Sequence, residues 1–290
     1  MFFATFRSTT KSVLRSVTFW LLLAMFLIIL VRYGIQQVQV YWEAAESVQV
    51  YLPDYEVPEH ISFQEYVSEI DNLVHAGSLI YPLALLVIIT TVLVLNRDYG
   101  DQFFEIEKAA GVKPAVYLLG RLSAVTVVTF VIQWVASFAI LQACVLGKGG
   151  VEGMSLLQYF GDALFRLTRT NLFIALPHIL FYVGITYFLG TLFKNGIAAA
   201  SGGFIYAIAF FVIYLLYRHE QAMEFYTEYL SPMPGKLRHF IAYWGLENEQ
   251  QMFARFGTSL GKALACIAFL VGVGAVCSVI AYVRIRKRET

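Results

Sequence analysis

The sequence predicts an all-α integral membrane protein, and three observations support this fold class. Hydrophobic residues make up 59% of the chain and charged residues only 14%. In soluble domains about a quarter of the residues are charged. Repeated apolar runs approach or exceed the length of about 20 residues that a helix needs to cross a bilayer. Finally, helices satisfy their own backbone hydrogen bonds, so they are the expected form of such runs in lipid.

Six apolar runs are interpreted as spanning helices of a single transmembrane domain, residues 1–290. No linker or internal repeat divides the chain. The predicted spans have the approximate bounds 17–35, 76–95, 116–145, 171–193, 197–217 and 260–283.

The distribution of basic residues predicts which side each connection faces. Basic residues gather at both termini, in the connection 96–114 and at the tight turn that begins with Lys194. The segment 36–72 contains many acids and no Lys or Arg. Because cytoplasmic connections carry an excess of basic residues, both termini are expected in the cytoplasm (N-in/C-in). The expected location is a cell membrane, with multiple passes, and specifically the bacterial cytoplasmic membrane.

The two long external segments, 36–72 and 218–257, each predict a short amphipathic helix on the outer membrane surface. In the first segment, Ser62 and Glu65 form a capping box in front of apolar residues at helical spacing. In the second, a helix is expected between Pro234 and Gly245, with apolar and basic residues on opposite faces.

The connection 96–114 predicts another short helix, at about 98–110, which ends before Gly111–Pro114. An ordered amphipathic helix between two spans is typical of a docking site for a partner protein. A solvated loop helix is the alternative. The candidate partner-binding residues are Asp98, Asp101, Phe103, Phe104, Glu105, Glu107 and Lys108.

The chain carries no recognisable catalytic motif. It lacks the G-x-x-x-x-G-K-[ST] phosphate loop and the H-E-x-x-H metal motif. We therefore expect no catalytic residues, no metal and no cofactor in this chain. The net charge of +1 gives no reason to expect nucleic-acid binding.

Four residues inside predicted spans are candidates for contact with a cargo or for gating. An ionisable residue within the membrane is a functional hypothesis by default, and His178 is the example here. The simpler reading is a neutral imidazole bonded to a carbonyl near the Pro177 kink. Gln133 is alternatively a polar contact between helices. Tyr206 and Phe210 are alternatively lipid contacts.

The pattern from residue 96 to residue 122 resembles the permease subunits of the ABC-2 type exporter family. Charged residues, a short helix, the turn Gly111–Pro114 and Arg121 early in the next span carry this resemblance. The six-span topology and the long segment between the last two spans agree with it. The resemblance is one of residue character and position, and the exact sequence differs. The run Asn96-Arg-Asp-Tyr-Gly-Asp101 stands where that family often has a Glu-Arg-Glu-x-Gly-Thr type run.

The resemblance implies a coupling helix at 98–110 that docks on a separate ATPase subunit, which binds ATP and Mg. It also implies pairing with a second permease copy or a homologue in the lipid bilayer. The expected function is ATP-driven export of a hydrophobic or amphipathic cargo, such as a peptide or drug. Two alternatives stay open at this point: an intramembrane enzyme using His178, and a membrane scaffold or sensor that transports nothing.

Overall fold

The computed structural model describes residues 1–51, 59–75, 80–100, 103–194, 199–200, 233, 235–244 and 249–287. Within these residues the chain is helical, with no strand and one isolated bridge between Ile61 and Val151. The elements, in chain order, are α1 (Phe2–Arg15), α2 (Val17–Tyr51), α3 (Phe63–His75), α4 (Ile80–Gly100), α5 (Phe103–Ala109), α6 (Pro114–Gly147), α7 (Leu156–Thr170), η1 (Asn171–Ala175), α8 (Leu176–Phe193), α11 (Gly235–Tyr243), α12 (Glu249–Phe256) and α13 (Leu260–Lys287).

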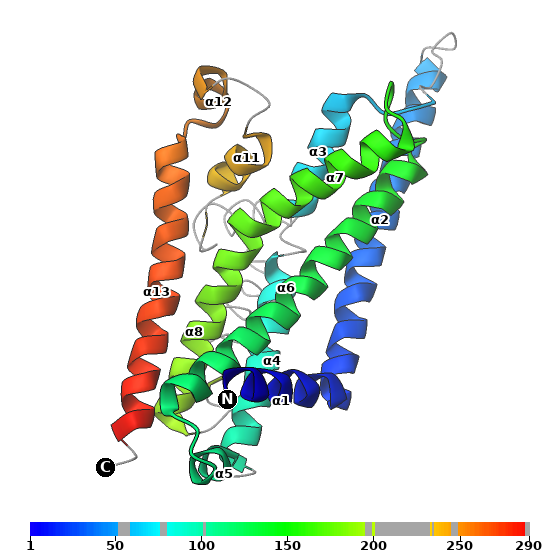
Figure 1. Cartoon of the computed structure of the whole chain (residues 1–290). Coiled ribbons are helices and arrows are strands. Elements are labelled where there is room, and N and C mark those ends of the chain that lie inside the picture. Colours follow the sequence, from blue (N-terminus) through cyan, green and yellow to red (C-terminus); the bar gives the residue numbers. More distant parts are fainter. Residues whose placement is uncertain are drawn as a thin grey trace, which may run out of the picture.

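Helix α8 lies beside α13 and also contacts α4 and α6 (Figure 1). The backbones of α8 and α13 approach closely at Gly184 and Gly274. A Cβ atom added to Gly184 would lie 2.4 Å from the carbonyl oxygen of Gly274. Glycines allow two helix backbones to approach closely, which is how spanning helices gain van der Waals contact in lipid.

Four helices are long and apolar enough to cross a membrane: Val17–Ala44, Pro114–Gly147, Leu156–Phe193 and Leu260–Lys287. They correspond to the first, third, fourth and sixth predicted spans, so the described structure is helical and compatible with a multi-pass membrane protein. The second predicted span coincides with most of α4, which is not among these four. The fifth, 197–217, lies almost wholly outside the described residues. Six spans therefore stay a prediction.

Two predicted boundaries differ from the structure. The polar segment that follows Ile35 continues α2 as far as Tyr51 rather than forming a loop. The helix predicted at about 98–110 is described as α5, from Phe103 to Ala109, and residues 98–100 belong instead to the end of α4. The segment 156–170 leads into the fourth predicted span through the π-helical turn η1. Figure 1 shows α7 leaning away from α8 at this turn. Wide turns of this kind are a recognised cause of helix bends.

The short helices predicted in the external segments are present as α3 and α11. The capping box is formed: the Ser62 backbone N–H donates to Glu65 Oε2 at 2.8 Å, and the Glu65 N–H donates to Ser62 Oγ at 3.3 Å. Helix α11 contacts α3, and its residues Phe240 and Ile241 are buried. The apolar face of α11 therefore packs within the protein, where the sequence had suggested contact with lipid headgroups.

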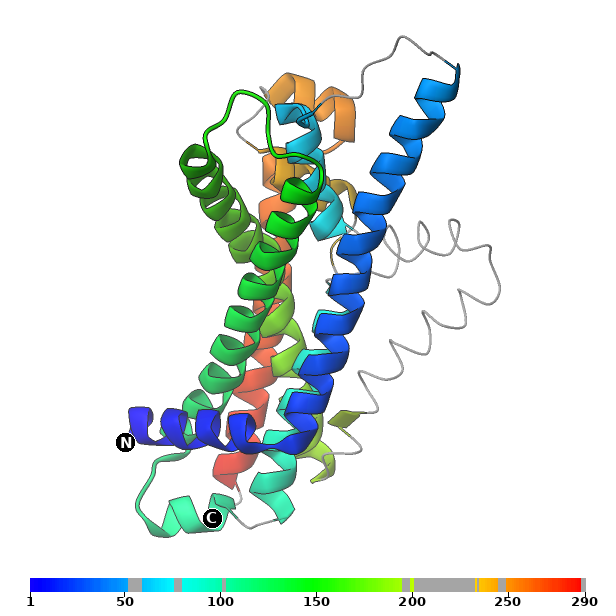
Figure 2. The same ribbon diagram turned by 90° about the vertical axis from the view of Figure 1, so that its right-hand side faces the viewer.

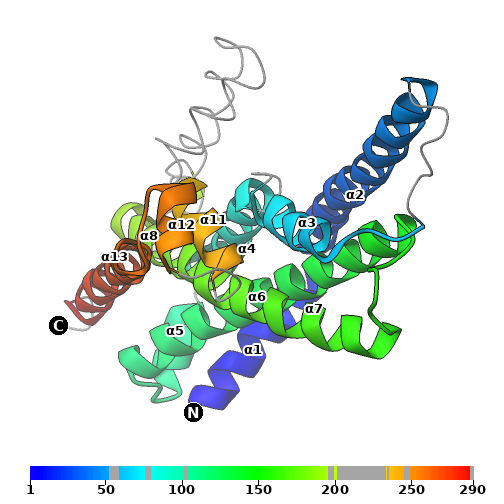
Figure 3. The ribbon, with the colours of Figure 1, turned by 90° about the horizontal axis from the view of Figure 1, so that it is seen from above.

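Helix α1 lies across the bundle rather than along it. Figure 2 shows it nearly perpendicular to α2, at the end of the bundle where α5 and the end of α13 also lie. Seen from above, α1 and α5 are neighbours (Figure 3). The face of α1 turned toward the protein consists of Thr5, Thr9 and Val13, all buried, and its basic residues Arg7 and Lys11 are exposed. This arrangement places basic residues of α1, α5 and α13 at one end of the molecule.

Candidate functional site

The candidate site is a buried ion cluster centred on Arg121, in the second turn of α6. The chain reaches this position through a compact turn. The Val112 N–H donates to the Glu107 carbonyl at 3.0 Å and the Gly111 N–H to the Lys108 carbonyl at 2.9 Å, with Gly111 at φ 78°. These bonds form a Schellman motif that ends α5. Pro114, at the first position of α6, then starts the next helix. The predicted turn Gly111–Pro114 is confirmed.

Arg121 is fully buried and pairs with two acids. Its Nη2 lies 3.0 Å from Asp98 Oδ1, at the end of α4, and 3.2 Å from Glu107 Oε1, on α5. A buried guanidinium needs such partners, because an unpaired charge in a protein interior costs several kcal/mol, on the order of 3–5 when a pair is broken. Three residues from the predicted coupling segment and its neighbourhood are thus brought together.

Helix α1 supplies the next contacts. Arg121 Nη1 donates to Thr9 Oγ1 at 2.6 Å, and Thr5 Oγ1 donates to Glu107 Oε2 at 3.2 Å. Packing holds the helices at this spacing, since a Cβ atom on Gly120 would lie 2.8 Å from Thr5 Cγ2. A Cβ atom at position 120 would force Thr5, and with it α1, to shift.

Two tyrosines complete the cluster. The Tyr187 hydroxyl, from α8, donates to Asp98 Oδ2 at 3.0 Å. The guanidinium carbon of Arg121 lies 5.0 Å from the centre of the Tyr117 ring, within the range of a cation–π contact. Burial raises the pKa of Asp98 to about 6, while Arg121 and hydrogen bonds from the two tyrosines oppose this rise. We refer to Thr5, Thr9, Asp98, Glu107, Tyr117, Arg121 and Tyr187 together as the Arg121 cluster.

The Arg121 cluster connects five helices: α1, α4, α5, α6 and α8. Displacing α5 moves the Glu107 carboxylate, and this carboxylate is bonded both to α6 and to α1. Because buried polar networks are stable only when their members stay paired, the other four helices must follow or the network must rearrange. The arrangement can therefore transmit a displacement of α5 into the bundle.

The predicted partner-binding residues divide into three groups. Asp98 and Glu107 point inward to Arg121, so their carboxylates are already occupied. Glu105 and Lys108 are exposed on α5, as is Ile106, which was not predicted. The backbone of Phe103 and Phe104 is helical, but their side chains, like the whole of Asp101, lie outside what the structure describes.

Of the four cargo and gating candidates, the structure describes His178 and Gln133. His178 is buried, and its Nδ1 lies 2.7 Å from the Ile174 carbonyl oxygen, one residue before the end of η1. This contact matches the simpler reading of a histidine bonded to a carbonyl near Pro177. Gln133 is also buried and donates to Ser137 Oγ within α6 at 3.0 Å. Tyr206 and Phe210 lie outside the described residues.

Sequence reasoning missed Thr5, Thr9 and both tyrosines of the cluster. One signal was available for α1. Thr5, Thr9 and Val13 recur every four residues, which marks a face turned toward protein on an otherwise basic helix. Tyr117 and Tyr187 carry no comparable signal, because an aromatic residue in a span is equally typical of lipid contact.

A second charged cluster lies at the opposite end of α6. Lys148 Nζ pairs with Glu69 Oε1 of α3 at 2.5 Å and lies 5.0 Å from the centre of the Tyr41 ring of α2. The adjacent backbone is bonded as well: the Ile61 N–H donates to the Gly150 carbonyl at 2.9 Å, and the Trp42 indole donates to the Gly147 carbonyl at 3.1 Å. We refer to Glu69 and Lys148, with these backbone bonds, as the Lys148 clasp.

Among the residues that the structure describes, no group of three or more His, Cys, Asp or Glu side chains is placed to hold a metal ion. Neither the scan against known family models nor the search of curated proteins found a match to this chain.

Proposed function

We propose that this chain is the membrane permease subunit of an ATP-driven exporter, and that α5 receives a separate ATPase subunit. The observation that supports this most is the Arg121 cluster. A helix that served only as a connection would have no need of a buried bond network to α1, α4, α6 and α8. Instead, Glu107 bonds α5 directly to α1 and α6, and Arg121 and Asp98 extend the network to α4 and α8.

The exposed part of α5 supplies a docking surface of the expected kind. Ile106 is 57% exposed and lies between the exposed residues Glu105 and Lys108. An exposed apolar residue with charges on either side is typical of a protein contact, in which the apolar group fills a pocket and the charges select the partner. The proposed orientation puts this surface in the cytoplasm, where ATP is available to the partner.

The proposed mechanism is a rigid coupling between the motor and the spans. Closure of two ATPase subunits on ATP and Mg would displace α5 in each permease of a dimer. Through Glu107 and Arg121 this displacement would reach α6, and through Asp98 and Tyr187 it would reach α4 and α8. Rigid-body shifts of packed helices are a common form of conformational switching. The proposed cargo is hydrophobic or amphipathic.

Two classes of variant separate docking from transmission. Ile106→Asp combined with Glu105→Lys alters the exposed surface and leaves the Arg121 cluster intact. Glu107→Gln removes one charge of the cluster and leaves Ile106 in place. Each variant is purified by an affinity tag from its native membranes, and co-purifying nucleotide-binding subunits are identified by mass spectrometry. ATPase activity is then measured in liposomes with candidate cargoes.

The docking variant should lose the ATPase subunit, whereas Glu107→Gln should keep the subunit and lose cargo-stimulated ATP hydrolysis. Lys236→Gln, an exposed substitution on α11, is the control and should change neither measurement. The proposal fails if no nucleotide-binding subunit accompanies the wild-type protein. It also fails if the docking variant retains full transport.

A further inference from the structure

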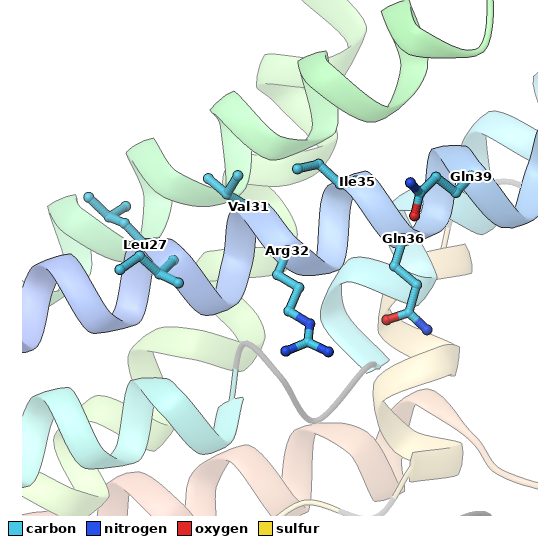
Figure 4. A pocket seen from close by; sticks show the side chains of 7 residues that line it. Leu27, Val31, Arg32, Ile35, Gln36 and Gln39 are labelled. Carbon is cyan, nitrogen blue, oxygen red and sulfur yellow. The ribbon is translucent and has the colours of Figure 1, made fainter.

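A second feature of the molecule is a polar face on the spanning helix α2. A cavity of about 610 Å³ lies along this helix. Its apolar lining is Leu27, Ile28, Val31 and Ile35, and its polar lining is Arg32, Gln36 and Gln39. Figure 4 shows Arg32 and Gln36 extending from the same side of α2. The cavity thus changes from apolar to polar along the direction of the helix.

Arg32 is exposed, and no described residue forms an ion pair or hydrogen bond with it. This distinguishes it from Arg121, which has two acidic partners. A cation in a spanning helix normally faces a polar partner or a water-filled cavity, since its insertion costs roughly 2.5–3.5 kcal/mol at the centre of a helix. We therefore expect Arg32 to pair with an anion that comes from outside the described part of the chain.

The depth of Arg32 suggests where that anion comes from. Helix α2 begins at Val17, directly after α1, which lies across the bundle end. Arg32 is fifteen residues further on, or about 22 Å along the axis at 1.5 Å per residue. The hydrocarbon core is about 30 Å thick. This rise puts Arg32 in the half of the bilayer remote from α1, where a long cationic side chain can extend its charge to the headgroups.

We propose that this face of α2 binds an anionic phospholipid from the leaflet remote from α1. The phosphate would accept charge-assisted hydrogen bonds from Arg32 and further bonds from the amide of Gln36. The acyl chains would run back toward α1 along Leu27, Ile28 and Val31. An amphiphile of this shape matches the cavity at both ends, because its acid lies at the polar end and its tail at the apolar end.

A neighbouring cavity agrees with a two-chain lipid. It has a volume of about 340 Å³ and lies between α2 and α6, lined by Gly34, Val38, Ala139 and Ile140 among others. It shares Val31, Ile35 and Gln39 with the first cavity. A second acyl chain has apolar surface available there, on the other flank of α2. This inference does not depend on an ATPase partner, so it can hold or fail independently of the proposed function.

The test is lipid binding to the full-length protein by native mass spectrometry. Delipidated protein is titrated with phosphatidylglycerol and, separately, with phosphatidylcholine. The wild type should bind the anionic lipid more tightly, and Arg32→Gln should weaken that binding by about tenfold, the effect expected for losing a charged hydrogen bond. Arg32→Lys should keep most of the preference. Lys262→Gln, an exposed cation at the start of α13, is the matched control.

Three results would overturn the proposal. The first is equal binding of the two lipids by the wild type, and the second is unchanged binding by an Arg32→Gln protein with a wild-type melting temperature. The third is efficient disulfide crosslinking of an Arg32→Cys variant to a second copy of the chain in membranes, which would show that protein covers this face. A Lys262→Gln variant that lost binding as strongly as Arg32→Gln would likewise contradict a specific site.

Discussion

The two ends of α6 hold charged clusters of different construction. Arg121 lies near the start of this helix and Lys148 directly follows its end, 27 residues later, or about 40 Å along the axis. Both side chains are buried. Arg121 has two acids around it, whereas Lys148 has one. When all groups are ionised, the Arg121 cluster has one negative charge in excess and the Lys148 clasp is neutral.

The surrounding backbone differs as well. At the Lys148 clasp, main-chain bonds join Ile61 to Gly150 and to Glu152, so two loops are held together apart from the ion pair. At the Arg121 cluster, the contacts between helices are made by side chains. Side-chain contacts exchange partners more readily than a backbone ladder does. We infer that the Lys148 clasp is a fixed anchor for one end of α6. The Arg121 cluster, whose side-chain bonds can exchange partners, is the adjustable end.

The largest effect is expected for Arg121→Gln, which leaves two buried acids without their cation. The free energy of unfolding should fall by about 3–5 kcal/mol. The midpoint of thermal unfolding in detergent should drop by about 10 °C for that loss in a chain of this size. Lys113→Gln, an exposed cation just before α6, should change the midpoint little.

The matching rescue tests the charge argument. Adding Asp98→Asn and Glu107→Gln to Arg121→Gln removes both orphaned charges and should restore most of the lost stability. Under the proposed function, transport should not return, because the neutral network no longer transmits a displacement of α5 to α6. Recovery of full transport would contradict the adjustable role that we infer for this cluster.

A smaller loss of stability is expected for Lys148→Met, because this substitution leaves one buried acid, Glu69, without its cation, whereas Arg121→Gln leaves two. A loss of about 3 kcal/mol is expected, at the lower end for a broken buried pair. The double variant Lys148→Met with Glu69→Leu should be nearly as stable as the wild type, since an apolar pair of similar volume replaces the ion pair. A double-mutant cycle of melting measurements checks both values.

Transport by the double variant then separates the two ends of α6. If the clasp is an anchor and the chain is the proposed exporter subunit, the apolar replacement should leave cargo-stimulated ATP hydrolysis close to normal. A double variant that is stable yet inactive would mean that the charges of the clasp take part in the transport cycle.

Much of the fold was predictable from local patterns. The capping box at Ser62 and Glu65 placed the start of α3, because this pattern is a local interaction within one helical turn. The same reasoning would have found Ser155 and Gln158, which form a second capping box at the start of α7. The continuation of α2 as far as Tyr51 was missed, since polar residues after an apolar run resemble a loop when the helical pairing is not visible.

The candidate site was predictable only in part. Asp98, Glu107 and Arg121 stood out because a charge beside a span is unusual. Their direction did not follow from sequence, and the inward orientation of Glu107 depends on α1, over a hundred residues away along the chain. Thr5 contacts Glu107 only because Gly120 lets α1 approach α6. Contacts of that kind are set by tertiary packing, which local spacing does not report.

The turn after α6 offers a graded test of the anchor. Gly149 has φ 93°, and a Cβ atom there would lie only 1.8 Å from the Glu59 carbonyl oxygen. Gly149→Ala should therefore cost about 2–3 kcal/mol, combining the strain of a left-handed backbone with a steric clash. Gly153 has φ 69° but no atom within 4 Å of its Cβ position, so Gly153→Ala should cost about 1 kcal/mol from backbone strain alone. Equal melting temperatures for the two variants would rule out the clash as the reason for glycine at position 149.

The smallest expected change in stability is at Gly120, where two effects oppose each other. Alanine is favoured over glycine in a helix by about 1 kcal/mol. The added Cβ would lie 2.8 Å from Thr5 Cγ2, so α1 must shift. The melting temperature of Gly120→Ala should then change little, while α1 loosens. Backbone hydrogen exchange in residues 5–13 should speed up by about fivefold, which corresponds to about 1 kcal/mol of local stability.

Two variants separate this local effect from a general one. Thr5→Ser removes the methyl group that clashes and keeps the hydroxyl that donates to Glu107, so adding it to Gly120→Ala should slow exchange toward the wild-type rate. Gly161→Ala, in α7, has no atom within 4 Å of the new Cβ and should leave the exchange of α1 unchanged. If Gly120→Ala left α1 as protected as in the wild type, the close approach of α1 to α6 would not be what holds Thr5 and Thr9 against the Arg121 cluster, and the adjustable end would have to be sought in α5 alone.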